Sequence, residues 1–187
     1  MSHGKLEVIT GCMFAGKTEE LIRRLRRAKI SGQSIEIVKP EIDDRYDQEK
    51  VSSHNGTQWE ATVLPVSSSG EMKLQELDAD VLAIDEFNFF EKEFLDILQS
   101  KADNGARVII CGLDQTYRGE PFSPMEKAMA LADDVAKLSA ICEECGEEAT
   151  KTQRLVDGEP APAQMPTIVV GGNENYQARC RDCHEVR

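Results

Sequence analysis

Short apolar runs alternate with amphipathic stretches along most of the chain. Runs typical of buried strands lie at residues 5–10, 34–40, 81–85 and 106–112. Stretches typical of helices lie at residues 19–29, 91–102 and 124–132. Nearly continuous apolar strands that alternate with helices indicate a parallel sheet covered on both faces. We therefore predict an α/β fold with a mainly parallel sheet between helices, and expect its functional loops at the carboxyl ends of the strands.

The pattern is weaker elsewhere in the chain. Residues 41–60 are polar with little periodicity, which predicts a long loop of the kind that is often functional in a compact domain. Residues 67–70 are typical of an ordinary turn. The composition changes after Lys137, where cysteine pairs and a stretch rich in Pro, Gly and acid begin. We predict a larger domain at residues 1–140 and a small domain at residues 141–187.

Composition and charge exclude several classes of protein. The 187 residues carry a formal net charge of −12, and 40% of them are hydrophobic, as in an ordinary globular protein. No apolar run approaches the roughly 20 residues of a membrane span, and no signal peptide precedes the first strand. We therefore expect a cytoplasmic protein without a membrane partner. So acidic a chain repels a nucleic-acid backbone, but a local cluster of N–H groups can still bind a small phosphorylated ligand.

A glycine-rich loop joins the first strand to the first helix. Its sequence fits the pattern G-x-x-x-x-G-K-[ST] through Gly11, Cys12, Met13, Phe14, Ala15, Gly16, Lys17 and Thr18. Backbone N–H groups at a helix N-terminus make an anion site, Lys17 can reach the β- and γ-phosphates, and the Thr18 hydroxyl can bind Mg²⁺. A chance glycine turn is the alternative, which the strand before the loop and the helix after it disfavour.

Two acids end the apolar run at residues 81–84. Asp85 can hold Mg²⁺, directly or through water, and Glu86 can take a proton from an attacking hydroxyl or water. Adjacent side chains of a strand point in different directions, so the two carboxylates can serve different purposes. Alone they would be read as solvated acids at a strand end, but the upstream phosphate loop favours a functional pair.

Aromatic side chains follow both of the later strands. Phe87, Asn88, Phe89 and Phe90 come directly after the acid pair, and residues 112–122 contain Tyr117, Arg118 and Phe122. Core packing is one interpretation, above all for Phe90. The alternative is an aromatic wall for a planar base, because stacking on a base contributes about 1–3 kcal/mol. The loop at residues 112–122 can equally be a surface turn.

Four of the six cysteines form two C-x-x-C pairs, Cys142 with Cys145 and Cys180 with Cys183. Two such turns can make a tetrahedral site of four thiolates, for which Zn²⁺ is the first choice and iron the second. A site with four protein ligands has no open position, which predicts a structural role. His184 is a competing ligand. Cys12 and Cys111 stand alone and are expected to be small buried side chains.

Taken in order, these motifs resemble the thymidine kinase family of the human cytosolic type and its bacterial relatives. The resemblance covers essentially the whole chain: G-C-M-F-A-G-K-T, the D-D-R-Y segment at residues 43–46, D-E-F-N-F-F at 85–90, G-L-D through P-F at 112–122, and G-G-x-x-x-Y-x-x-x-C-R-x-C at 171–183. Each motif alone is moderate support, but the ordered set is strong.

The resemblance implies an ATP:thymidine 5′-phosphotransferase with a RecA-like larger domain, Mg²⁺, structural zinc and a tetrameric assembly, for which dTTP would be a feedback inhibitor. It implies Glu86 as the general base and Asp85 as the acid associated with Mg²⁺. Besides the glycine loop, the residues implied in binding ATP and its phosphates are Asp43, Arg45, Asp85, Glu86, Phe87 and Asn88. Those implied in binding thymidine are Met13, Phe89, Leu113, Tyr117, Phe122, Thr167, Ile168, Val169, Val170, Gly171 and Tyr176, of which the last six belong to a lid.

This chain departs from the family pattern at four positions. Cys12 replaces a common proline, Ala15 a serine, Asn88 a glutamine and Tyr117 a phenylalanine. Two other functions remain open. A nucleotide-hydrolysing ATPase or GTPase would share the phosphate loop and the acid pair but would not need the aromatic residues and cysteines. A zinc-ribbon nucleic-acid-binding protein is disfavoured by the acidic charge.

Overall fold

The computed structural model describes residues 4–42, 50–52, 58–167 and 176–187. The helices are α1 (Lys17–Ile30), α2 (Ser68–Glu76), α3 (Phe94–Asp103) and α4 (Ser123–Leu131), with a 3-10 helix η1 (Phe87–Phe89). The strands are β1 (Lys5–Gly11), β2 (Ile35–Pro40), β3 (Lys50–Ser52), β4 (Gln58–Glu60), β5 (Thr62–Leu64), β6 (Val81–Ile84), β7 (Arg107–Leu113), β8 (Asp134–Leu138), β9 (Ala140–Ile141), β10 (Glu148–Ala149), β11 (Lys151–Val156), β12 (Glu159–Pro160) and β13 (Tyr176–Arg179).

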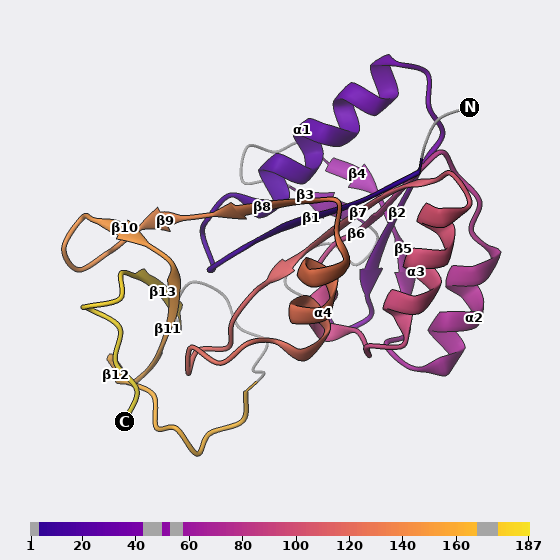
Figure 1. Cartoon of the computed structure of the whole chain (residues 1–187). Helices are drawn as coiled ribbons and strands as arrows, with labels where there is room; N and C mark the ends of the chain where they lie inside the picture. Colours follow the sequence, from indigo (N-terminus) through magenta and orange to yellow (C-terminus); the bar gives the residue numbers. More distant parts are fainter. Residues whose placement is uncertain (1–3, 43–49, 53–57, 168–175) are drawn as a thin grey trace.

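A six-stranded sheet in the order β5-β2-β6-β7-β1-β8 forms the centre of the fold, and all its neighbouring strands are parallel. Helix α1 covers one face of the sheet, and α2, α3 and α4 lie on the other (Figure 1). The predicted parallel sheet between helices is therefore confirmed. Because β7 lies between β1 and β6, the phosphate loop and the acid pair emerge at the same edge, on either side of β7.

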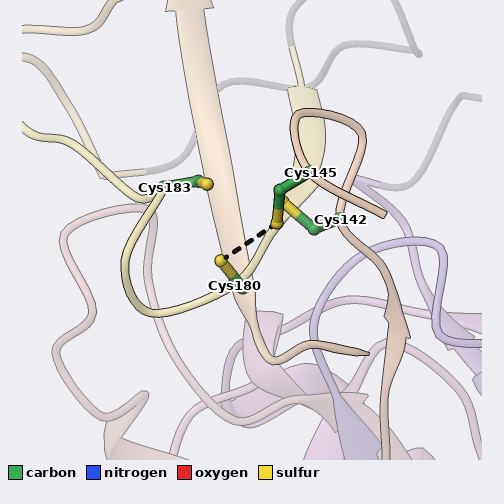
Figure 2. A group of neighbouring side chains, drawn as sticks. All are labelled: Cys142, Cys145, Cys180 and Cys183. Atoms are coloured by element: carbon green, nitrogen blue, oxygen red, sulfur yellow. Dashed lines mark hydrogen bonds between the residues drawn. The ribbon is translucent and has the colours of Figure 1, made fainter. Parts of the chain in front are cut away.

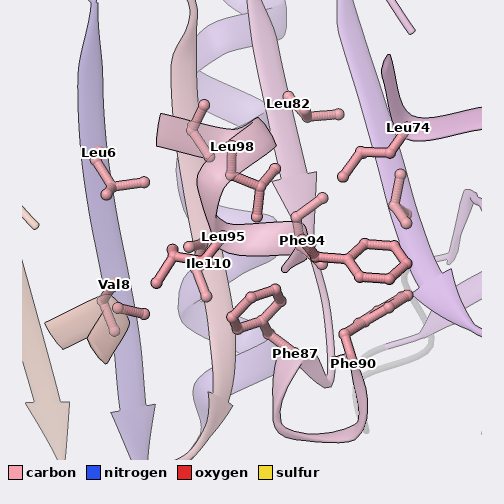
Figure 3. Close-up of a cluster of buried hydrophobic side chains, with 14 of the residues drawn as sticks. Leu6, Val8, Leu74, Leu82, Phe87, Phe90, Phe94, Leu95, Leu98 and Ile110 are labelled. Atoms are coloured by element: carbon pink, nitrogen blue, oxygen red, sulfur yellow. The ribbon is translucent and has the colours of Figure 1, made fainter. Parts of the chain in front are cut away.

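Alternate residues of each strand supply the two faces of the core. Ile9 and Ile109 pack with Leu25 of α1, whereas Val8 and Ile110 pack on the side of α3. Figure 3 shows the second cluster, which includes three stacked or tilted phenylalanines. Burying one such side chain stabilises the fold by about 1.5–3 kcal/mol, and both clusters fix the strands whose ends carry the site.

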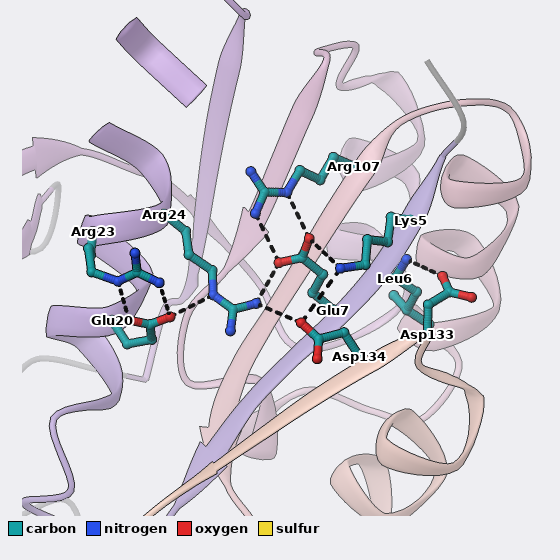
Figure 4. Close-up of polar contacts among 9 residues, drawn as sticks. All are labelled: Lys5, Leu6, Glu7, Glu20, Arg23, Arg24, Arg107, Asp133 and Asp134. Atoms are coloured by element: carbon teal, nitrogen blue, oxygen red, sulfur yellow. Dashed lines mark hydrogen bonds and ion pairs between the residues drawn. The ribbon is translucent and has the colours of Figure 1, made fainter. Parts of the chain in front are cut away.

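One buried strand residue is charged. Glu7 of β1 is 3% exposed and accepts hydrogen bonds from Arg24 of α1 and Arg107 of β7. Lys5 lies 3.3 Å from the same carboxylate. Figure 4 shows these ion pairs joining β1 to α1 and β7. The sequence pattern did not predict this network, because a lone Glu in an apolar run gives no sign of its partners.

Two local predictions were wrong. Residues 67–70 are not just a turn, because α2 begins at Ser68. A Cβ at Gly70 would lie 1.8 Å from the carbonyl oxygen of Pro65, so only a glycine lets α2 approach Pro65 this closely. In the sequence, the same glycine looks like part of a turn. Residues 41–60 are not all loop, because β3 and β4 pair in antiparallel fashion.

The C-terminal segment builds its own small sheets, one of β10 and β9 and one in the order β12-β11-β13. Strand β8 still belongs to the large sheet, and β9 begins at Ala140. A domain boundary near residue 140 stays a prediction. Within the described ranges, no helix has both the length and the apolar character that crossing a bilayer demands.

Candidate active site

The loop from Gly11 to Gly16 has a backbone that favours glycine at both ends. Gly11 and Gly16 have φ of 142° and 78°. A Cβ at Gly11 would also lie 2.3 Å from the carbonyl oxygen of Leu138. Helix α1 then begins at Lys17, and no side chain caps its N-terminus at Gly16. A helix N-terminus preceded by a glycine loop is the arrangement that anion sites use.

The remaining loop residues are partly buried and partly exposed. The Lys17 amine donates to the carbonyl oxygen of Cys12 at 2.8 Å. The Cys12 thiol is 2% exposed, and burial raises its pKa, so the predicted small buried side chain is confirmed here. Met13 and Ala15 are partly exposed, as is Thr18, and Phe14 is 38% exposed.

The acid pair follows β6 in an unusual backbone conformation. Asp85 is 8% exposed, and its carboxylate accepts a hydrogen bond from the Glu86 N–H at 3.0 Å. Glu86 has φ of 52° and ψ of 41°, which is left-handed. That conformation is rare outside glycine, and strain of this kind gathers at functional sites. The left-handed backbone at Glu86 therefore marks the acid pair as a candidate functional element.

Cys111 shows that these groups share one electrostatic neighbourhood. Burial raises the pKa of its thiol well above the usual value, the negative charges of Asp85 and Glu86 raise it further, and Lys17 lowers it. Cys111 is itself fully buried on β7, as predicted for a small side chain. Because β7 lies between β1 and β6, the phosphate loop after β1 and the acid pair after β6 flank the end of this strand.

The aromatic segment after the acid pair divides between core and surface. Phe87 and Phe90 are 0% and 3% exposed and pack in the core (Figure 3), whereas Phe89 is partly exposed. The core interpretation of Phe90 is confirmed. The Phe87 side chain lies in the core too, which leaves only its backbone to contact a phosphate.

Asn88 ties the acid segment to the next loop. Its side-chain oxygen accepts a hydrogen bond from the Leu113 N–H at 2.9 Å. A Cβ at Gly112 would lie 2.8 Å from that oxygen, so the glycine makes room for this bond. In this structure Asn88 therefore positions the loop at residues 112–122, and whether it also contacts ATP stays a prediction.

Tyr117 is buried beneath the chain of residues 162–167. It is 3% exposed, and its hydroxyl lies 2.9 Å from the carbonyl oxygen of Pro162 and 3.1 Å from that of Met165. Arg118 donates to the Met165 carbonyl oxygen and to the Thr167 hydroxyl. Thr167 is therefore held directly by the loop at residues 112–122.

The other nucleoside candidates lie in mixed surroundings. Phe122 is 9% exposed and belongs to the main core, and Leu113 packs against that core. Tyr176, 8% exposed, starts β13 and pairs with Arg154 of β11. Six further candidates lie outside the described residues, namely Asp43, Arg45, Ile168, Val169, Val170 and Gly171.

The four paired cysteines converge. Cys142 and Cys145 lie between β9 and β10, Cys180 and Cys183 follow β13, and all four sulfur atoms lie within 4.8 Å of one another (Figure 2). A tetrahedral site with metal–sulfur bonds of about 2.3 Å has sulfur atoms about 3.8 Å apart. The 3.6 Å between the Cys145 and Cys180 sulfurs is close to that value. The donor set therefore fits a metal such as zinc.

The grouping of ligand atoms favours four cysteines over a histidine ligand. Among the described residues, the ligand atoms that gather are the four cysteine sulfurs without a nitrogen of His184. The Nε2 atom of His184 lies 2.8 Å from the carbonyl oxygen of Tyr117. Burial raises the pKa of Cys142, but backbone N–H groups outweigh it and lower that pKa to about 6, whereas contacts with the other cysteines raise the pKa of Cys145 and raise that of Cys183 to about 12. A thiolate is the form that binds a metal.

Comparison with known proteins identifies the family. The thymidine kinase family model matches residues 4–184. The thymidine kinase of Halobacterium salinarum is 52% identical over 98% of this chain and 95% of its own length. That of Haloquadratum walsbyi is 48% identical over 98% and 96% of the two chains.

The chain belongs to the thymidine kinase family. It is thereby a phosphotransferase, as its motifs predicted. Among solved structures, the large terminase of a thermophilic bacteriophage matches 72% of this chain and 40% of its own, with a TM-score of 0.44 and 10% identity. So distant a likeness adds nothing to the family assignment.

Two residues of this thymidine kinase family member escaped the sequence analysis. Thr152 accepts a hydrogen bond from the Met13 N–H at 3.1 Å. Arg154 donates to the carbonyl oxygen of Pro166 and lies over the Tyr117 ring. Both are on β11, in a segment without a motif, and only the fold brings them to the loops.

Proposed function

We propose that this protein transfers the γ-phosphate of ATP to the 5′-hydroxyl of thymidine, giving ADP and dTMP. One observation carries the proposal. In a chain of the thymidine kinase family, a phosphate loop containing Lys17 and an acid pair at residues 85–86 converge at one edge of a parallel sheet. Salvage of thymidine for DNA synthesis is the corresponding role.

The phosphate loop binds the ATP phosphates. Phosphoryl transfer depends on positioning and charge neutralisation more than on covalent help. The N–H groups at the start of α1 and the Lys17 amine supply positive ends for the phosphates, and the Lys17 amine is already held over the loop by Cys12. Asp43 and Arg45 are proposed to act near the transferred phosphate on family resemblance alone.

Thr18 and Asp85 are proposed to hold Mg²⁺. Their hydroxyl and carboxylate oxygens are the donors this cation prefers. When bound, the cation offsets the charge of the phosphates. Asp85 contributes a buried carboxylate at the carboxyl end of β6, on the edge where the phosphate loop also emerges.

Glu86 is proposed to take the proton from the 5′-hydroxyl as that oxygen attacks phosphorus. Its left-handed backbone is a strained conformation of the kind that gathers at functional sites. In this assignment Asp85 faces the cation and Glu86 faces the nucleoside. A general base contributes about 10²- to 10⁴-fold to the rate.

The nucleoside is proposed to bind between the loop at residues 112–122 and the C-terminal lid. Phe89 and Met13 are partly exposed and can contact the base, whereas Leu113 and Phe122 lie deeper. The hydrogen bonds of Tyr117 and Arg118 to residues 162–167 support a fixed base for the lid. Tyr176 and residues 167–171 complete the proposed pocket.

The remaining assignments are also proposals. The four-cysteine cluster holds a structural Zn²⁺, which keeps the C-terminal segment folded around the pocket. The enzyme works in the cytoplasm as a homotetramer, with dTTP as feedback inhibitor and no nucleic-acid partner. Deoxyuridine is expected as a second substrate, because a single methyl group contributes only about 1–3 kcal/mol to discrimination.

The decisive experiment measures ADP release from ATP and Mg²⁺ with and without thymidine. Release that requires thymidine and is matched by dTMP formation supports the kinase. Equal release without nucleoside would instead indicate a hydrolysing ATPase. A panel of nucleosides in the same assay then defines the acceptor.

A further inference from the structure

Two hydrogen bonds join the phosphate loop to the cysteine-containing C-terminal segment. The Met13 N–H donates to the Thr152 hydroxyl at 3.1 Å, and the Cys12 thiol donates to the carbonyl oxygen of Ala149 at 3.4 Å. Thr152 is 4% exposed and Ala149 is fully buried, so water does not compete freely at these contacts. The loop is therefore supported by elements more than a hundred residues away in sequence.

The first of these bonds acts on the peptide group that also holds the phosphate-loop lysine. The carbonyl of the Cys12–Met13 peptide accepts from the Lys17 amine at 2.8 Å, and the N–H of the same peptide donates to Thr152. A peptide group is planar, so its C=O and N–H cannot turn independently. Losing the Thr152 hydroxyl therefore releases the group that orients Lys17.

Thr152 and Ala149 are in turn placed by the cysteine turns. Thr152 pairs with Ala178 across β11 and β13, and the carbonyl oxygen of Ala178 accepts from the Glu143 N–H at 3.0 Å, between the first two cysteines. Ala149 and Ala178 also pack with Cys142 in one buried cluster. Only one or two contacts thus separate the phosphate loop from the cysteine cluster.

We propose that Thr152 is a positioning residue for the nucleotide phosphates, and that the metal held by the four cysteines strengthens nucleotide binding through it. This rests on the proposed function in one respect, that the loop binds a nucleotide. The cysteine site then does more than keep a lid folded, because it helps to set the phosphate loop.

The test compares Thr152→Val with Thr152→Ser. Valine keeps the shape of the side chain but cannot accept the bond, whereas serine keeps the hydroxyl. One such bond corresponds to about a two- to tenfold change in affinity. We expect the Kd for a fluorescent ADP analogue and the KM for ATP to rise by that factor in T152V, with the KM for thymidine within about twofold of wild type. T152S should restore both values.

The second measurement removes the metal. Chelation should raise the Kd for the ADP analogue in wild type and T152S, but add little in T152V, where the connection is already broken. Far-UV circular dichroism reports whether the stripped protein stays folded. If it unfolds, the influence of the metal is no more than its role in folding and that part of the inference is overturned, while the comparison of T152V with T152S, made with the metal bound, decides the role of Thr152.

Two results would overturn the inference. Unchanged ADP affinity in T152V removes Thr152 from the phosphate site, and an equal effect of chelation in T152V and wild type removes it from the metal's influence. Failure of the proposed function gives a different result, which is wild-type protein that binds ADP but does not phosphorylate thymidine.

Discussion

Glu7 makes the stability of this protein depend on pH in the acidic range. Its carboxylate is buried on β1 and bonded to Arg24 and Arg107 (Figure 4). Desolvation by itself raises the pKa of Glu7, but the two arginines and Lys5 outweigh it and lower the pKa from 4.5 to about 2. The experiment therefore lowers the pH and compares the stability of wild type with that of the Glu7→Gln variant.

The size and the sign follow from that shift. Each pKa unit corresponds to about 1.4 kcal/mol, so a shift from 4.5 to about 2 contributes about 3 kcal/mol. Because the folded-state pKa is lowered, this contribution is complete above pH 4.5 and is lost as the pH falls toward 2. At neutral pH, Glu7→Gln should cost about 3–5 kcal/mol, since it also leaves buried arginines without their partner.

The assay is urea unfolding at several pH values between 7 and 2.5, followed by circular dichroism. The free energy of unfolding of the Glu7→Gln variant is subtracted from that of wild type at each pH. This difference cancels the contribution of groups that titrate alike in both proteins. The difference should shrink by about 2–3 kcal/mol as the pH falls below 4.5. Asp96→Asn is the control, because its ion pair with Lys127 is 70% and 46% exposed and should contribute less than about 1 kcal/mol.

A difference that stays constant across this pH range would refute the reasoning. It would mean that the Glu7 carboxylate titrates alike in the folded and unfolded protein, and that its arginine partners do not hold the charge. A shrinking difference in Asp96→Asn as well would point to a general acid effect instead of Glu7.

Three further outcomes test other parts of the structure. Glu86→Gln should lower kcat by about 10²-fold or more while nucleotide affinity stays near wild type, and unchanged turnover would remove Glu86 from proton transfer. Cys145→Ser should lower the zinc content found by elemental analysis, and should reduce folding or assembly more than the turnover of the folded enzyme. Wild-type protein that contains no zinc would refute the four-thiolate site. Raising salt from about 0.01 to about 1 M should raise Tm, because a net charge of −12 repels itself and salt screens that repulsion; a Tm that falls steadily would contradict this.

The main elements were predictable because each has a strong local signal. The strand at 81–85 and the helix at 19–29 correspond to β6 and α1 within a few residues. Their apolar patterns reflect burial on the sheet, which a single sequence can show. Helix α2 was missed because Gly70 imitates a turn signal while serving a close contact with Pro65.

The candidate site was predictable only as far as its motifs reach. The phosphate loop and the acid pair contain their own residue patterns, so their convergence at one sheet edge could be predicted. The left-handed backbone of Glu86 could not, because that conformation is favoured by glycine and nothing nearby signals it. Thr152 lies on an ordinary strand and becomes significant only through its contact with Met13.

Tyr117 shows how the fold changes the meaning of a substitution. From sequence, its hydroxyl is an unexplained addition where relatives have phenylalanine. In the structure the hydroxyl lies 2.9 Å from the carbonyl oxygen of Pro162, and Arg118 and Arg154 lie over the ring. One buried hydrogen bond contributes about 1 kcal/mol, so the hydroxyl helps to hold residues 162–167 in place. The fold thus gives this hydroxyl a structural contact that the sequence alone could not show, while a contact of Tyr117 with the base stays a prediction.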